Sequence, residues 1–174
     1  MATKLTHPYF GVLDTSTLEC KEDEYLPLWE QELPYKGNIV LVDFWFEKDQ
    51  PISKSRLDAF EAFLKNLSQK EAQAREAIRQ YLKENPDEFD YFKGKNDEVP
   101  DDIDTFVDEL EMDMLDLWYP QDPGEPDVNL YFSPLNQNDE LWDDDDLEED
   151  DIFDEEGLSV SFTLSGKILS VEWE

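Results

Sequence analysis

The segment that most constrains the fold spans residues 39–46, which read Ile-Val-Leu-Val-Asp-Phe-Trp-Phe. Apart from one aspartate the run is apolar, and it is the strongest strand signal in the chain. Near-continuous apolar runs of this length are typical of strands that are covered on both faces. The segment therefore predicts a central β-strand that is buried on both sides.

Further strands are expected toward both ends of the chain. Apolar or alternating segments mark them at residues 10–13, 25–33, 128–132, 158–164 and 168–173. Another strand is expected to begin near Met114, in a stretch that could also extend the helix before it. Pro27 interrupts the second segment, which indicates an edge strand or a bulge. The last two segments alternate around a turn at Ser165 and Gly166, which predicts a hairpin with one buried face.

The middle of the chain has helical periodicity. Residues 53–85 predict a helical hairpin, with Ser53 as the N-cap of its first helix. The apolar stripe of that helix consists of Leu57, Phe60, Phe63, Leu64 and Leu67. Ser68 and Glu71 have the spacing of a capping box, so a second helix is expected to start there and to end before Pro86. A third, shorter helix is expected at residues 99–111.

Strands at both ends with helices between them predict a single α+β domain over residues 1–174. The expected architecture is an antiparallel sheet of about five to seven strands, with the helical hairpin packed on one face. Residues 121–156 are expected to be mostly irregular. Within them, residues 139–156 predict an acidic loop or insert.

The charge of the chain is strongly one-sided. There are 46 acidic and 14 basic residues, which gives a formal net charge of −32. Residues 96–166 contain 26 of the acids and no lysine or arginine, whereas half of the bases lie in the predicted helical hairpin. Such a chain repels nucleic acid and anionic membranes and attracts basic partners or metal ions. A basic protein is therefore the expected partner, without direct binding to nucleic acid or to a membrane.

The acidic insert supplies the candidate partner-binding residues. Its carboxylates are interleaved with apolar side chains, and apolar anchors ringed by charge suit docking onto a basic protein. The candidates are Trp142, Asp143, Asp144, Asp145, Asp146, Glu148, Glu149, Asp150, Asp151 and Phe153. Two other interpretations stay open. The run could be a solvated loop that tolerates charge, or its apolar residues could fold it onto its own domain.

Residues that carry catalysis are scarce. His7 is the only histidine, and Cys20 is the only cysteine and lies among acids that disfavour a thiolate. One of each cannot complete a Cys/His zinc site, and the six glycines form no phosphate-binding loop. The sequence therefore predicts a protein that is not an enzyme and has no cofactor or metal. A cytoplasmic location is expected, because the sequence shows no secretory signal or membrane-spanning run.

A set of short motifs resembles a known family. They are His7-Pro8-Tyr9-Phe10-Gly11, Val42-Asp43-Phe44-Trp45-Phe46, the helical hairpin and the closing segment from Ser165-Gly166-Lys167-Ile168 to Glu172-Trp173-Glu174. Together they resemble a bacterial family of small acidic α+β proteins of unknown function. That family is similar to the immunity proteins of polymorphic toxin systems. The resemblance implies no catalytic residue and no cofactor.

Three functions remain as hypotheses. The first is a non-enzymatic binding protein, immunity-like, that neutralises a basic toxin or nuclease. The second is a nucleic-acid mimic that occupies a DNA-binding protein, which needs carboxylates held in ordered rows. The third, and weakest, is an acid- or metal-dependent hydrolase, which needs a deep pocket with two or more carboxylates of raised pKa.

Overall fold

The protein is described from a computed structural model. The structure describes residues 3–19, 26–95, 98–134 and 157–174. Cys20 and all ten candidate partner-binding residues of the acidic insert lie outside these ranges. The hypothesis of a docking loop at residues 139–156 is therefore not tested by the structure.

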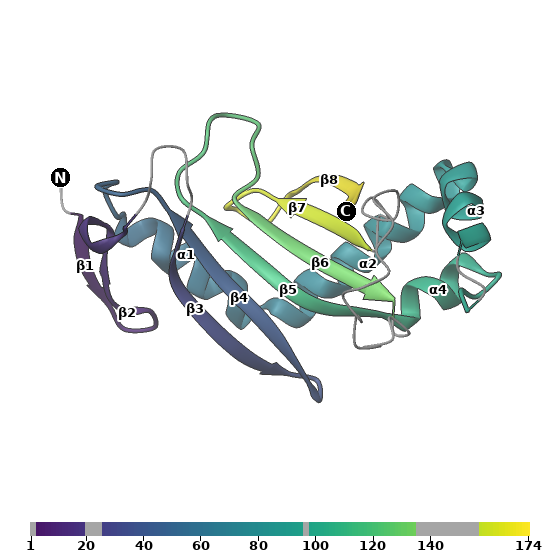
Figure 1. The fold of residues 1–174 in the computed structure, drawn as a ribbon, viewed down its shortest axis with the longest axis horizontal. Helices are drawn as coiled ribbons and strands as arrows, with labels where there is room; N and C mark the ends of the chain where they lie inside the picture. Colours follow the sequence, from purple (N-terminus) through teal and green to yellow (C-terminus); the bar gives the residue numbers. More distant parts are fainter. Residues whose placement is uncertain (1–2, 20–25, 96–97, 135–156) are drawn as a thin grey trace, which may run out of the picture.

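A six-stranded sheet forms the body of the described chain (Figure 1). Its strands lie in the order in which they occur in the sequence. They are β3 (Leu26–Tyr35), β4 (Asn38–Phe46), β5 (Leu110–Trp118), β6 (Val128–Pro134), β7 (Leu158–Phe162) and β8 (Ile168–Trp173). All neighbours are antiparallel except β4 and β5, which are parallel. The predicted α+β class is confirmed, and the sheet is mostly rather than wholly antiparallel.

A separate two-stranded sheet precedes the main one. It pairs β1 (Lys4–His7) with β2 (Gly11–Asp14) and is followed by the 3₁₀ turn η1 (Thr15–Thr17). Phe10, between its strands, is buried and packs its ring 5.6 Å from that of Phe44 and 4.9 Å from that of Trp29. These ring contacts attach the small sheet to the start of the large one.

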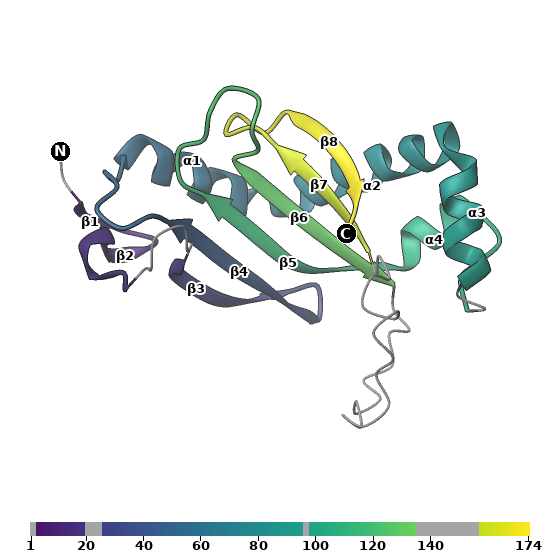
Figure 2. The ribbon, with the colours of Figure 1, turned by 45° about the horizontal axis from the view of Figure 1, so that its top comes forward.

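The described helices all lie in the crossover from β4 to β5. They are α1 (Lys54–Lys65), α2 (Leu67–Glu84), α3 (Pro86–Lys95) and α4 (Ile103–Glu109). Parallel neighbours need such a crossover, because the chain must return to the same end of the sheet. Figures 1 and 2 show α1 and α2 passing behind the sheet along the same side. Ring contacts of 5.2 Å between Phe60 and Phe44 and of 5.3 Å between Phe63 and Phe162 fix α1 there.

The helix boundaries follow the sequence signals only in part. Ser53 caps α1 as predicted, since its side chain accepts a hydrogen bond from the Arg56 amide. The capping box of Ser68 and Glu71 is wrong: α2 begins at Leu67, directly after Asn66, and neither residue caps it. Because Asn66 alone separates α1 from α2, the predicted hairpin is not confirmed.

The predicted end of the second helix before Pro86 is confirmed, since α2 ends at Glu84 with Asn85 as its C-cap. Pro86 then starts α3, because proline lacks the amide hydrogen that the first turn of a helix leaves unpaired anyway. Two further boundaries differ from the prediction. The third predicted helix is shorter than expected, with Asp102 as the N-cap of α4, and β5 begins at Leu110 rather than near Met114. Pro27 does mark an edge strand with a register shift, as predicted.

Strand β4 is correctly predicted but is not buried on both sides. Val40, Val42, Phe44 and Phe46 point to the helices and are at most 1% exposed. The residues between them point the other way, and Ile39 and Leu41 are 56% and 47% exposed. The helices cover one face of the sheet and leave the apolar side chains of the other face in contact with solvent.

Candidate functional site

The side of the six-stranded sheet that no described element covers is the candidate functional site, and we call it the open face. Strand register and burial assign its side chains, since successive residues of a strand point to opposite faces. From β3 and β4 come Glu30, Glu32, Ile39, Leu41, Asp43 and Trp45. From the other strands and the residue after β8 come Met114, Asp116, Trp118, Asn129, Tyr131, Ser159, Ser161, Ser170, Glu172 and Glu174.

The centre of the open face holds a carboxylate among aromatic rings. Asp116 is only 5% exposed, and Trp45 Nε1 donates a hydrogen bond to its Oδ1 at 3.0 Å. The Tyr131 hydroxyl lies beside this carboxylate and accepts a hydrogen bond from Asn129 Nδ2 at 3.3 Å. The indoles of Trp45 and Trp118 stack beside this group with ring centroids 5.8 Å apart. The result is a polar network fixed between neighbouring strands.

Burial and mutual repulsion change the acidity of the neighbouring carboxyls. Desolvation raises the pKa of Asp116 above its usual value, although the hydrogen bonds from Trp45 and Tyr131 work against it. Desolvation also raises the pKa of Asp43, and the charges of Asp116 and Glu30 raise it further. Burial likewise raises the pKa of the Tyr131 phenol. The open face therefore holds its negative charge against an electrostatic cost, which a positive partner would relieve.

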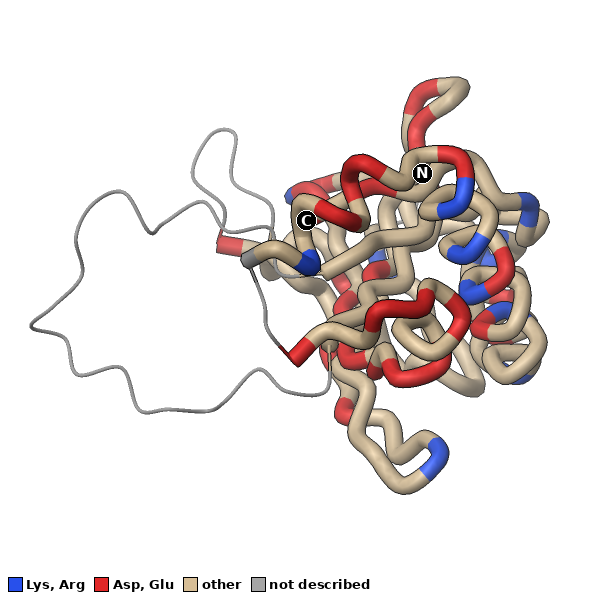
Figure 3. Tube along the Cα trace, turned by 90° about the vertical axis from the view of Figure 1, so that its right-hand side faces the viewer, with Lys and Arg blue, Asp and Glu red and all other residues tan. Residues whose placement is uncertain are grey.

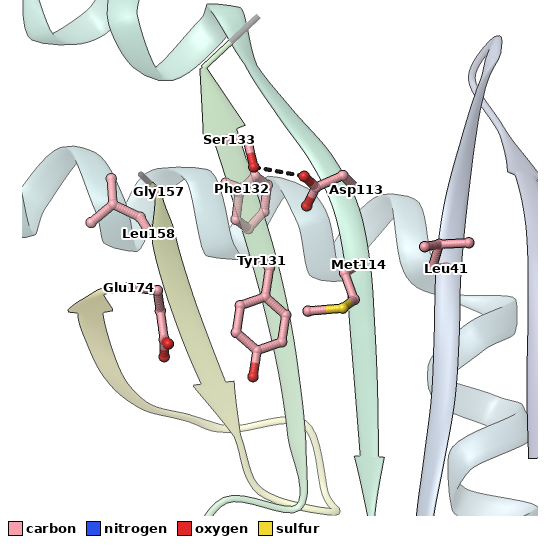
Figure 4. Close-up of a pocket in the computed structure, with 9 residues that line it drawn as sticks. All are labelled: Leu41, Asp113, Met114, Tyr131, Phe132, Ser133, Gly157, Leu158 and Glu174. Atoms are coloured by element: carbon pink, nitrogen blue, oxygen red, sulfur yellow. Dashed lines mark hydrogen bonds between the residues drawn. The ribbon is translucent and has the colours of Figure 1, made fainter. Parts of the chain in front are cut away.

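Two hollows lie side by side on the open face and share Glu174. The first, of about 340 Å³, is mainly apolar and has Leu41, Met114 and Tyr131 along it (Figure 4). In that view Tyr131 stands between Met114 and Glu174, and Ser133 donates a hydrogen bond to Asp113 at 2.6 Å. We call it the apolar hollow.

The second hollow, of about 420 Å³, is polar, and we call it the polar hollow. Its walls come from the loop before β6 and from the last strands of the sheet. The lining consists of Gly124, Glu125, Pro126, Asn129, Ser159, Ser161, Leu169, Ser170, Glu172 and Glu174. None of these residues is basic. Ser159 and Ser161 are buried, so the serines form a floor beneath the exposed carboxylates of Glu172 and Glu174.

One cluster away from the open face has the composition of a metal site. His7, Asp58 and Glu61 place ligand atoms within 4.8 Å of one another. The hydrogen bonds of the ring argue against a metal. His7 Nδ1 accepts the Tyr9 amide at 3.1 Å, so the neutral ring carries its proton on Nε2, which lies 2.8 Å from Asp58 Oδ1. Both nitrogens are occupied, and His7 ties the first small strand to α1 as a structural residue.

Most of the described basic residues lie toward the helical side of the sheet (Figure 3). Figure 3 shows lysine and arginine gathered mainly toward the helices, while acids are spread over the rest of the described chain. Several of these bases have structural partners. Arg75 on α2 donates to the carbonyls of Val107 and Leu110 and to Glu71, which also accepts from Lys36 and Tyr35. Internal acids therefore neutralise part of the basic set, and the open face keeps its charge.

Comparisons with protein-family models, with curated proteins and with solved structures each returned no match. The resemblance to immunity proteins of toxin systems therefore stays a prediction that rests on its short motifs. Among the residues that the structure describes, no helix combines the length and apolar character needed to cross a bilayer.

The open face was missed at the level of sequence, although a signal for it exists. In residues 39–46 the odd-numbered positions include Asp43, the one charged residue, whereas the even-numbered positions are wholly apolar. In the neighbouring strand, Glu30 and Glu32 repeat the same period of two. That period is the mark of a strand with one solvent-facing side.

Proposed function

We propose that this is a non-enzymatic acidic binding protein that docks a basic protein on the open face, as an immunity-like inhibitor of a basic toxin or nuclease would. One observation carries the proposal. Ile39 and Leu41, two large aliphatic side chains that are about half exposed, stand next to Glu30, Glu32 and Asp43 on a sheet face that no described element covers.

This composition suits a protein partner. Contiguous exposed apolar side chains with a polar rim mark interaction surfaces, because water solvates them poorly. The carboxylates around them steer a positive surface into contact, and the apolar centre then supplies the area that is removed from water. On the described helices most large apolar residues are buried against the sheet, and Tyr91 on α3 is the exception at 66% exposed.

The two other hypotheses find less support on this face. A nucleic-acid mimic needs rows of solvated charge, whereas Asp116 is buried and exposed Leu41 interrupts the acids of β3 and β4. A hydrolase needs acidic groups free to act in a pocket. Asp43 and Asp116 have raised pKa values, but they line neither hollow, and donors already occupy Asp116.

Photocrosslinking from two opposite sides tests the proposal. A photoreactive residue is placed at Leu41 on the open face or, as the matched control, at Glu76 on the outer side of α2, whose side chain is 75% exposed. Each protein is irradiated in lysate of its source cell, and the adducts are identified by mass spectrometry. We expect one basic protein to be captured from Leu41 and not from Glu76, with a rate of association that falls as salt is raised. Equal adducts from both positions, or none from Leu41, would refute the open face as a docking surface.

A further inference from the structure

The two hollows adjoin at Glu174 and differ in chemistry, and we call the pair the groove. One half offers Leu41, Met114 and the ring of Tyr131, and the other offers carboxylates above a floor of serines. Glu174 lines both, and Ser159 Oγ donates to its Oε1 at 2.9 Å, which holds this carboxylate at the boundary. A segment that fits both halves must carry an apolar group directly beside a cationic one.

Asn129 adds an observation that is independent of the carboxylates. It lines the polar hollow, is 9% exposed, and its Oδ1 is buried without a hydrogen-bond partner in the described structure. Asn129 Nδ2 donates to the Tyr131 hydroxyl at 3.3 Å, which leaves the amide oxygen as the atom without a partner. A buried acceptor without a donor costs free energy, and a donor that enters the hollow would recover it.

The polar end of the groove therefore favours a ligand group that carries hydrogen-bond donors and positive charge. Guanidinium provides both, because it carries five N–H donors in one plane and can bind a carboxylate through two of them at once. An ammonium group is a more strongly hydrated point charge, so it loses more hydration free energy when it leaves water. Because Asn129 Oδ1 is shielded from solvent, the entering group must press into the floor of the hollow, which a planar group does best.

We propose that the groove recognises an arginine flanked by an aliphatic residue on the basic partner, with the guanidinium in the polar hollow against Glu172, Glu174 and Asn129. The aliphatic side chain lies in the apolar hollow on Met114 and Tyr131. This inference rests on the proposed function, and it specifies which residues of the partner the open face recognises.

A blocked tripeptide tests the inference without the natural partner. Acetyl-Leu-Arg-Leu-amide is titrated into the ¹⁵N-labelled full chain, and amide shifts are followed by NMR. Citrulline, which keeps the shape of arginine but has no charge, replaces it in one comparison peptide, and lysine replaces it in another. We expect saturable shifts at Ser159, Ser161, Ser170 and the Asn129 side chain, and affinity about tenfold lower for the citrulline peptide. The lysine peptide should fall between the two.

Variants of the protein separate recognition from general attraction to a polyanion. Glu172→Gln and Glu174→Gln change exposed side chains and should each weaken binding, whereas Glu76→Gln removes the same charge from the helical side and should not. Asn129→Ala should weaken binding about tenfold if the variant keeps the wild-type spectrum elsewhere. The inference is overturned if the citrulline or lysine peptide binds as well as the arginine peptide, or if the shifts spread over α1 and α2.

The two experiments fail independently. If the tripeptide does not bind while Leu41 captures a basic protein, the arginine groove is wrong and the docking face stands. If the tripeptide binds as described while no protein is captured from Leu41, the groove stands and the proposed function is wrong.

Discussion

The guanidinium of Arg56 on α1 and the carboxylate of Asp127, directly before β6, are joined by a hydrogen-bonded ion pair of 2.6 Å. The same guanidinium donates to the carbonyls of Trp118 at the end of β5 and of Tyr119 after it. Arg75 does the equivalent at the other end of β5 through Val107 and Leu110. Arg56 and Arg75 therefore attach the two ends of β5 to the helices.

Replacing Arg56 with Met should lower the free energy of unfolding by about 3–5 kcal/mol, because Asp127 is left largely buried without its partner. Urea unfolding followed by circular dichroism measures the change. Arg79→Met is the control: its partners Asp104 and Asp108 are exposed, so its loss should cost no more than about 1 kcal/mol. Similar costs for the two variants would contradict the structural role of Arg56.

Glu71 should make the protein sensitive to acid. Burial alone would raise its pKa, but hydrogen bonds from Lys36, Tyr35 and Arg75 outweigh burial and lower the pKa below 4.5. Because the folded-state pKa is depressed, this stabilisation is complete above about pH 5.5 and is lost as the pH falls through the folded-state pKa. In Glu71→Gln, stability at neutral pH should fall and its decline in acid should become shallower. The control Glu76→Gln should keep the wild-type pH profile in the same urea titrations.

The pKa of Asp116 should lie above the ordinary aspartate value, whereas the pKa of Asp58 should lie below it. Desolvation raises its pKa above 3.8, whereas a hydrogen bond from Lys54 and a second from His7 lower the pKa of Asp58 below 3.8. Ionisation of Asp116 therefore costs the folded state stability, and that cost develops as the pH rises from 3.8 through the folded-state pKa. Carbon-detected NMR of the side-chain carboxyls measures both groups in one titration. A lower titration midpoint for Asp116 than for Asp58 would contradict the described hydrogen-bond network around Asp116.

Leu41 and Val42 should separate binding from stability, since they are adjacent on β4 and point to opposite faces. Leu41→Ala should change the free energy of unfolding by less than about 0.5 kcal/mol, because the side chain is already half exposed. Val42→Ala should cost about 2 kcal/mol or more through loss of burial and the cavity left in the core. Thermal unfolding measures stability, and the photocrosslinked partner provides the binding assay. Loss of binding in Val42→Ala alone would place the interface elsewhere.

The sequence predicts local structure well where a side chain interacts only with its own helix or with the core beneath it. Ser53 caps α1, and the spacing of Phe60 and Phe63 places the buried stripe of the helix correctly. Prediction fails where a residue has a distant partner. Glu71 looks like a capping residue, but Tyr35 and Lys36 draw it into a buried cluster that no local pattern encodes.

Two larger features were also missed, the first because a weak local signal was masked and the second because no local pattern encodes it. The apolar run of residues 39–46 predicts a strand correctly, but its hydrophobicity hides that one side is solvated. The direction of β5 relative to β4 depends on how a crossover of more than sixty residues is routed, which periodicity does not specify. The acidic candidates from Trp142 to Phe153 lie outside the described residues, so their role stays a prediction.

The parallel pairing of β4 and β5 has a consequence for how this architecture could change. Among the connections that the structure describes, those between antiparallel neighbours stay at the ends of the sheet, and the crossover from β4 to β5 passes over one of its faces (Figure 1). One crossover covers one face of the sheet. Point substitutions on the open face can change its polarity, but they cannot cover it. The described helices cannot cover both faces at once, so a cover for the open face has to come from another segment of the chain or from another molecule.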